Sequence, residues 1–114
     1  MLDRDWKLRI EDILESIAKV ERYTAGMTFA TFTADEKTID AVVRNFTIIG
    51  EAARYIPQEI EARYPLLPWN EMRGMRNIVV HEYFGVSFSI LWHTLKQNLP
   101  PVVPMLKEIL ERES

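Results

Sequence analysis

The segment 76–83, with the sequence RNIVVHEY, combines side chains that together suit chemistry on a phosphodiester. The guanidinium of Arg76 is a permanent cation whose planar fork of N–H donors fits phosphate oxygens. The imidazole of His81 can accept or release a proton near neutral pH. Because the chain has only two His residues, one that stands so close to an Arg is a candidate for catalysis.

Helical spacing places the polar residues of this region on one face. At about 100° per residue, Arg73, Asn77 and His81 form one ridge, and Arg76 and Tyr83 stand on the neighbouring ridge. The polar face carries two Arg and no acidic residue, which favours phosphate recognition. The alternative is an ordinary solvated helix face. Apolar residues fall on the opposite side: Met72, Met75, Ile78 and Val79.

The composition fits one compact domain, residues 1–114, with a hydrophobic core. Of the 114 residues, 47% are hydrophobic and 27% are charged. The absence of Cys excludes disulfides, thiolate metal sites and a Cys nucleophile. The first residues are charged, unlike a signal peptide, and no apolar run is long enough to cross a bilayer. We therefore expect a cytoplasmic protein without membrane contact.

The net charge of −3 argues against binding nucleic acid through the general surface. Proteins that bind in that way are usually basic. Any contact with RNA must therefore be local, or be created where two chains meet.

The hydrophobic periodicity predicts an all-α protein. Trp6 and Ile10 open an apolar stripe on the first helix, which Gly26 is expected to stop. Thr33 and Glu36 have the spacing of a capping box at the start of the second helix. The predicted helices span residues 3–24, 33–56, 68–84, 87–99 and 103–113, and residues 58–64 are expected to form a short helix or a turn.

These helices are expected to form an up-and-down bundle of four or five helices. The apolar residues on the first two helices are numerous for so small a bundle. We therefore expect part of that surface to be buried against a second copy of the chain.

The pattern Arg76-x4-His81-x-Tyr83 resembles the signature of HEPN-domain toxins, in particular the HepT family. Residues 45–53, NFTIIGEAA, are similar to the second-helix block of that family, and residues 68–77, PWNEMRGMRN, are similar to the approach to its catalytic helix. The length and the helical pattern agree along nearly the whole chain. Family members often have an acidic residue soon after the Tyr, where this chain has Ser87, which caps a helix about as well as Asp.

The resemblance implies a HEPN-type bundle and a homodimeric endoribonuclease toxin without metal or cofactor, in a toxin–antitoxin pair of type II or type VII. It implies Arg76 and His81 as the catalytic pair, supported by Asn77. It also implies a cognate antitoxin, an MntA-like nucleotidyltransferase, which transfers adenylate from ATP to Tyr83. The helix geometry adds Arg73 as an accessory phosphate contact.

A metal-free mechanism would use the 2′-OH of RNA as the nucleophile. Arg76 would stabilise the charged phosphorane, and His81 would act as base or acid. One His per chain cannot easily serve both sides of a phosphate, so we expect a composite site on the axis of a homodimer. Three clustered carboxylates open a helix and complement its dipole, which is a better explanation than a metal site: Asp35, Glu36 and Asp40.

Other side chains are weaker candidates. His93 lies on a helix with strong apolar spacing, where a His is more often packed or at the surface. Arg44 and Asn45 could line the groove or tie helices together. Three Trp residues could stack on bases, although a small bundle usually buries them: Trp6, Trp69 and Trp92.

Two other functions remain open. A HEPN-like dimer could bind a nucleotide, or present substrate to a partner nucleotidyltransferase, without cutting RNA. The bundle could also be purely structural and only dimerise. Cleavage should vanish in His81→Ala if the chain is a ribonuclease, whereas simple nucleotide binding should depend more on Arg76.

Overall fold

The computed structural model describes residues 5–82 and 88–114, and the side chains of residues 5–77 and 88–114. All regular secondary structure in these residues is helical, as the sequence predicts. None of the described helices is long and apolar enough to span a membrane. The helices are α1 (Asp5–Tyr23), α2 (Phe29–Thr33), α3 (Glu36–Ala53), α4 (Gln58–Arg63), α5 (Trp69–Glu82), α6 (Phe88–His93), the π-helical segment η1 (Thr94–Asn98) and α7 (Val102–Arg112).

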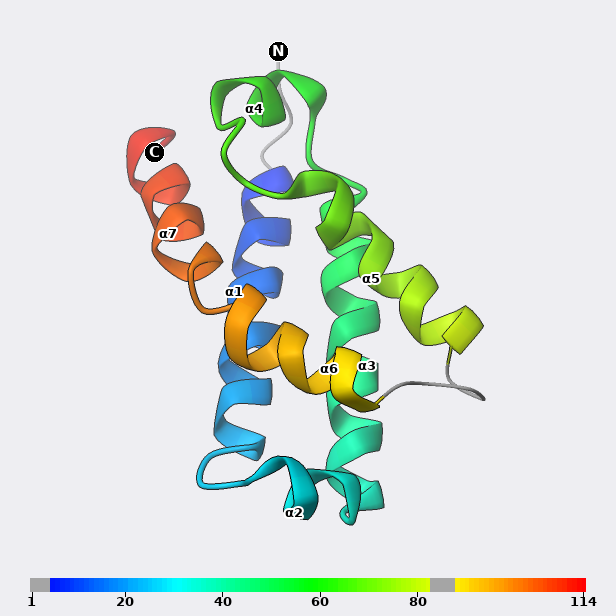
Figure 1. The fold of residues 1–114 in the computed structure, drawn as a ribbon. Helices are drawn as coiled ribbons and strands as arrows, with labels where there is room; N and C mark the ends of the chain where they lie inside the picture. The colour runs from blue at the N-terminus through cyan, green and yellow to red at the C-terminus, as the bar shows by residue number, and fades with distance from the viewer. Residues whose placement is uncertain (1–4, 83–87) are drawn as a thin grey trace.

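Helices α1 and α3 lie side by side along the length of the bundle, and the other helices are arranged around them (Figure 1). Helix α5 packs on α3, and α7 packs on α1. The continuous segment formed by α6 and η1 lies across α1 and α3 (Figure 1). The short helices α2 and α4 lie at opposite ends (Figure 1). Apart from these two, the described segments form the predicted bundle of four to five helices.

The apolar stripes predicted for the first two helices form the core of the single chain. Because these side chains are already buried, the stripes do not require a second copy, and the homodimer stays a prediction. The buried residues are Trp6, Ile10, Ile13, Ile17 and Val20 on α1, and Ile39, Val42, Phe46 and Ile49 on α3.

The predicted stop after α1 is confirmed, because Gly26 has a φ of 77° that only Gly adopts readily. Ser87, which the sequence suggests as a helix cap, lies outside the described residues.

The start of α3 corrects one prediction. The spacing of Thr33 and Glu36 predicts a capping box, but Thr33 is the last residue of α2, and its hydroxyl donates to the carbonyl of Ala30 at 3.0 Å. The N-cap is Asp35, whose carboxylate accepts a hydrogen bond from the backbone N–H of Thr38 at 3.1 Å. This hydrogen bond holds the pKa of Asp35 below its usual value.

Helix α2 itself is not predicted from the sequence. It begins with a capping box in which the side chains of Thr28 and Thr31 each accept from the other residue's backbone N–H. Such a pair replaces two hydrogen bonds that the first turn of a helix lacks. The side chain of Phe32 on this helix is completely buried, which anchors the connection between α1 and α3 in the core.

The helix predicted for residues 87–99 changes character at Thr94. The backbone N–H of Leu99 donates to the carbonyl of Thr94 at 3.0 Å, so the last turn closes over five residues instead of four. Pro100 and Pro101 follow and cannot donate further helical hydrogen bonds. Helix α7 then starts at Val102, close to the predicted position.

Candidate active site

The start of α5, the helix that carries the motif, is fixed by hydrogen bonds to the preceding loop. The indole N–H of Trp69 donates to the carbonyl of Tyr64 at 2.9 Å, and the N–H of Met72 donates to the carbonyl of Pro68 at 2.9 Å. Trp69 is buried, as is Leu67 just before it. These contacts set the direction in which α5 leaves the loop.

The predicted division of α5 into two faces is confirmed for the side chains that the structure describes. Met72 and Met75 are buried in the core. Arg76 and Asn77 are exposed, and Arg73 is half-buried. The candidate cations and the amide therefore lie at the surface on a helix that the core holds from its other side.

Two predicted site residues fall outside what the structure describes. His81 lies on α5, but its side chain is outside the described part of the chain, as are those of Ile78 and Val79 on the predicted apolar face. Tyr83 lies outside the described residues altogether. The structure therefore brings together Arg73, Arg76 and Asn77, and the roles of His81 and Tyr83 stay predictions.

Gly50 on α3 lets the backbone of α5 approach at the position of Arg76. A Cβ atom added to Gly50 would stand 2.6 Å from the Arg76 backbone nitrogen and 2.8 Å from its Cβ. It would also stand 3.2 Å from the carbonyl oxygen of Arg73. Close helix packing therefore explains this Gly, and the contact fixes where the Arg76 side chain begins.

We expect Gly50→Ala and Gly74→Ala to have opposite effects on stability. At Gly50 the added methyl forces α5 away from α3, which should destabilise the fold by about 1–3 kcal/mol. At Gly74, on the same helix as Arg76, a Cβ would meet nothing within 4 Å, so the helix propensity of Ala should stabilise by up to about 1 kcal/mol. Denaturant unfolding of both variants measures the difference, and a stabilising Gly50→Ala would contradict the close packing.

The arginines of the exposed face are paired with carboxylates from neighbouring helices. Arg76 Nε lies 2.6 Å from Glu51 Oε1, and the other oxygen of Glu51 accepts from Arg54 Nη1 at 3.3 Å. Arg73 forms an ion pair with Glu61 and a hydrogen bond with the side chain of Asn70. Among its described side chains, the motif helix presents no acid on this face, but α3 and α4 supply acids that the sequence pattern does not place there.

Because of these ion pairs, Arg73 and Arg76 differ in how freely they can bind a phosphate. Both terminal nitrogens of Arg73 are engaged, one by Glu61 and the other by Asn70. The ion pair of Arg76 uses Nε, and its side chain keeps 45% of its surface exposed. Arg76 is therefore the better placed of the two to bind a phosphate.

Asn45, one and a half turns before Gly50 on α3, is buried with only half of its amide satisfied. Its Nδ2 donates to the carbonyl of Ala41 at 2.8 Å, and its Oδ1 has no partner among the described residues. Arg44 beside it is exposed. This hydrogen bond stays within α3, so it does not tie two helices together, and the buried Asn45 faces the protein interior.

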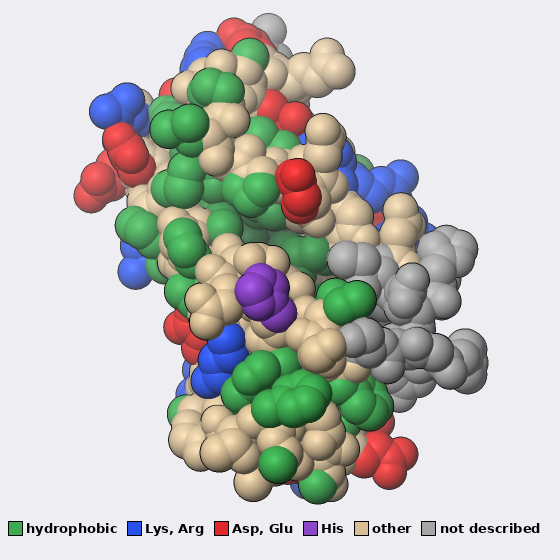
Figure 2. Space-filling view, in the orientation of Figure 1, with side chains coloured by type: hydrophobic (Ala, Val, Ile, Leu, Met, Phe, Trp, Pro, Cys, Tyr) green, Lys and Arg blue, Asp and Glu red, His purple; other side chains and the backbone are tan. Residues whose placement is uncertain are grey.

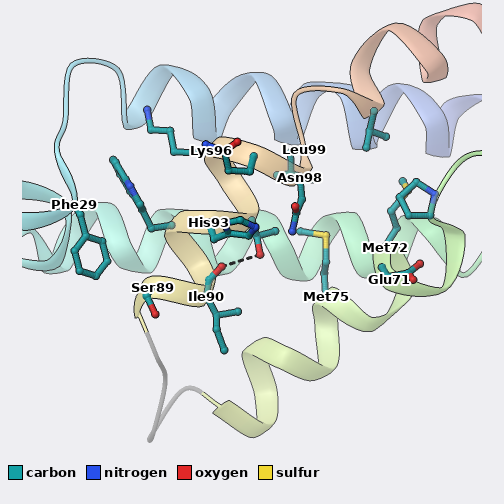
Figure 3. Close-up of a pocket in the computed structure, with 15 residues that line it drawn as sticks. Phe29, Glu71, Met72, Met75, Ser89, Ile90, His93, Lys96, Asn98 and Leu99 are labelled. Atoms are coloured by element: carbon teal, nitrogen blue, oxygen red, sulfur yellow. Dashed lines mark hydrogen bonds between the residues drawn. The ribbon is translucent and has the colours of Figure 1, made fainter.

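An apolar groove of about 770 Å³ lies on the other side of α5, bordered by α2, α6 and η1. Figure 2 shows hydrophobic side chains gathered around this hollow, and Figure 3 shows Phe29, Met75 and Ile90 along it. His93 and Lys96 stand at the groove, and the described site residues Arg73, Arg76 and Asn77 do not line it. The structure therefore separates His93 from Arg76.

The prediction that Trp residues belong to the core is confirmed for Trp6 and Trp69. Trp92 is half-buried beside the groove, where its ring lies 5.1 Å from that of Phe32 and under the ammonium of Lys96. Its exposed edge is therefore the one Trp surface in the described residues that a ligand could reach. Within the same residues, no group of three His, Asp or Glu side chains could hold a metal ion.

Comparison with known proteins gives a consistent result over most of the chain. A family model described as ribonuclease HepT-like matches residues 13–111. The chain is 41% identical over 99 residues to "Probable ribonuclease HepT" of Thermococcus cleftensis, an alignment that covers 87% of this chain and 90% of the relative. It is 39% identical over 102 residues to a protein of Methanocaldococcus jannaschii that carries an RNase name, covering 90% and 94% of the two chains. No solved structure gives a significant match.

Proposed function

Because the chain belongs to the ribonuclease HepT-like family, we propose that it is an endoribonuclease toxin that cleaves RNA through Arg76 and His81 without a metal ion. The observation that carries this proposal is the family match over residues 13–111, which includes all of α5 and the motif. The exposed position of Arg76 supports it, since a phosphate can reach the guanidinium. Asn77 is exposed beside Arg76 and supports the pair.

In the proposed reaction, the 2′-oxygen of RNA attacks the neighbouring phosphorus. The new bond from the 2′-oxygen to phosphorus forms as the bond to the 5′-oxygen breaks, which leaves a 2′,3′-cyclic phosphate and a 5′-hydroxyl. A base takes the proton of the 2′-OH, and an acid protonates the leaving 5′-oxygen. The guanidinium of Arg76 stabilises the charge that develops on the phosphorane.

The two proton transfers occur on opposite sides of the phosphate, so a second imidazole is needed near the first. A two-fold homodimer that brings two α5 helices together supplies a second His81 and a second Arg76. It also brings two Arg76 guanidinium groups together in a protein whose net charge is −3. A stably monomeric variant that cleaves RNA at the normal rate would contradict this composite site.

Cleavage of RNA by the purified, unmodified chain in the presence of a chelator tests the proposal, with His81→Ala as the inactive reference. Cleavage that survives chelation and is absent from the reference supports a metal-free nuclease. No cleavage, by protein that mass spectrometry shows to lack adenylate, favours the non-catalytic nucleotide-binding module. Equal cleavage by both proteins indicates a contaminant or another site.

The proposed antitoxin is an MntA-like nucleotidyltransferase that adenylylates Tyr83. Tyr83 follows Arg76 by seven residues, which is about two helical turns, so adenylate on its hydroxyl would place phosphate charge near the guanidinium. We expect Tyr83→Phe to keep its nuclease activity and to escape neutralisation when it is incubated with the antitoxin and ATP. Loss of cleavage by an adenylylated Tyr83→Phe chain would place the modification elsewhere.

A further inference from the structure

We propose that Glu51 is a positioning residue, which holds the Arg76 guanidinium by its Nε and leaves the terminal nitrogens to face an RNA phosphate. This inference rests on the proposed nuclease function and deepens it. Glu51 comes from α3, so the residue that aims the catalytic Arg belongs to a different helix from the motif.

The first argument is the arrangement of charges around the carboxylate. Oε1 of Glu51 lies 2.6 Å from Arg76 Nε, and Oε2 accepts a hydrogen bond from Arg54 Nη1 at 3.3 Å. Each oxygen therefore has its own cation. Because Arg54 lies at the second oxygen, the first oxygen is turned toward Arg76.

The second argument is that the neighbouring residue fixes the other end of the Arg76 side chain. Gly50 places the α3 backbone against the Arg76 backbone nitrogen and Cβ. Two consecutive residues of α3 therefore constrain Arg76, Gly50 at its main chain and Glu51 at Nε. A long side chain whose base and Nε are both in contact with α3 has fewer orientations to sample before a substrate binds.

The third argument is the chemistry of the guanidinium. Its five N–H donors form a planar fork, of which Nε carries one and the two terminal nitrogens carry four. Within the described part of the chain, the ion pair with Glu51 is made at Nε and leaves the terminal pair, which can bind two phosphate oxygens at once. The side chains of Arg76 and Glu51 are 45% and 37% exposed, so the pair lies where RNA can reach it and contributes little to the stability of the fold.

If Glu51 only competed with RNA phosphate for Arg76, it would inhibit cleavage instead of promoting it. Removing its charge would then raise RNA affinity and the cleavage rate. The two roles therefore predict changes of opposite sign, and one substitution, Glu51→Gln, distinguishes them because it removes the charge and keeps the size of the side chain.

We expect Glu51→Gln to lower kcat for RNA cleavage by about tenfold to a hundredfold, with KM changed by no more than about twofold. The matched control is Glu108→Gln, which removes another partly exposed carboxylate paired with an Arg, Arg112 at 2.9 Å, far from α5 in sequence. This control should cleave RNA like the wild type. Melting temperatures of both variants should match the wild type, since both pairs are at the surface.

A second readout does not need activity. In ¹⁵N-labelled protein, the Nε–Hε signal of Arg76 should be displaced from those of exposed arginines, and Glu51→Gln should return it to their position. An Arg76 signal that Glu51→Gln leaves unchanged overturns the inference, as does unchanged or faster cleavage by that variant. If the wild-type chain cleaves no RNA, the proposed function is overturned together with the inference. If the wild type is active and Glu51→Gln is equally active, the inference alone is overturned.

Discussion

His81→Ala should lose RNA cleavage by about 10²- to 10⁴-fold, because a positioned acid or base contributes a rate factor of that size. The chain has one other His, His93, and it lies at the groove on the other side of α5. Because Arg76 does not line that groove, we do not expect His93 to take over the proton transfer. Initial rates of cleavage of a fluorescent RNA, with the protein shown to be folded by circular dichroism, measure the loss.

His93→Ala is the matched control for this experiment. The His93 side chain is exposed on α6, so its removal should leave both the fold and the cleavage rate close to those of the wild type. If His93→Ala lost as much activity as His81→Ala, the assignment of the catalytic His would be wrong. A fully active, folded His81→Ala would remove the proposed mechanism.

Arg76→Ala should lower kcat by about 10²- to 10³-fold, the size expected when one donor to a developing anion is removed. Arg76→Lys should recover little of this loss. Lysine keeps the charge, but it lacks the planar fork that can bind Glu51 and a phosphate at the same time. The charge alone is therefore not expected to suffice.

Arg112→Ala is the appropriate comparison, because Arg112 is an exposed Arg on α7 that is also paired with a Glu. This variant should cleave at the wild-type rate, and it controls for the loss of one positive charge. Recovery of normal cleavage by Arg76→Lys would show that charge, and not the geometry of the fork, is what the site requires.

The periodicity of the sequence predicts the long helices correctly because their buried side chains repeat every three or four residues. The buried stripe on α1, from Trp6 to Val20, needs no tertiary information to be recognised. The polar and apolar faces of α5 follow from the same rule, as Met75 and Arg76 illustrate. Local spacing therefore suffices to predict a long helix and its buried face when one side of the helix packs against the core.

Local spacing fails where two signals compete. Thr33 and Glu36 fit a capping box, but Thr33 ends α2, so the neighbouring Asp35 takes the cap. Helix α2 has only five residues, too few for a period to be visible. The π-helical turn at Thr94 is not visible in the sequence pattern either, because the apolar spacing of residues 87–99 reads as an ordinary helix.

The site could be predicted only in part, for a related reason. The motif predicts Arg76 as the phosphate ligand, but its spacing says nothing of what other helices bring to it. Glu51 stands 25 positions earlier in the chain, and its contact with Arg76 exists because Gly50 allows α3 and α5 to pack closely. The sequence does contain the pair Gly50-Glu51, but it can be linked to Arg76 only when the packing of α3 against α5 is known.

The carboxylates around the exposed arginines also set how RNA affinity should respond to ionic strength. An isolated cation that neutralises one phosphate of single-stranded RNA contributes about −0.7 to the slope of log K against log salt, through release of condensed counterions. Arg73 and Arg76 already share their charge with Glu61 and Glu51, so each neutralises less than one phosphate. Binding should therefore lose little affinity as salt rises, and the protein should discriminate against long, unstructured polyanions that bind by charge alone.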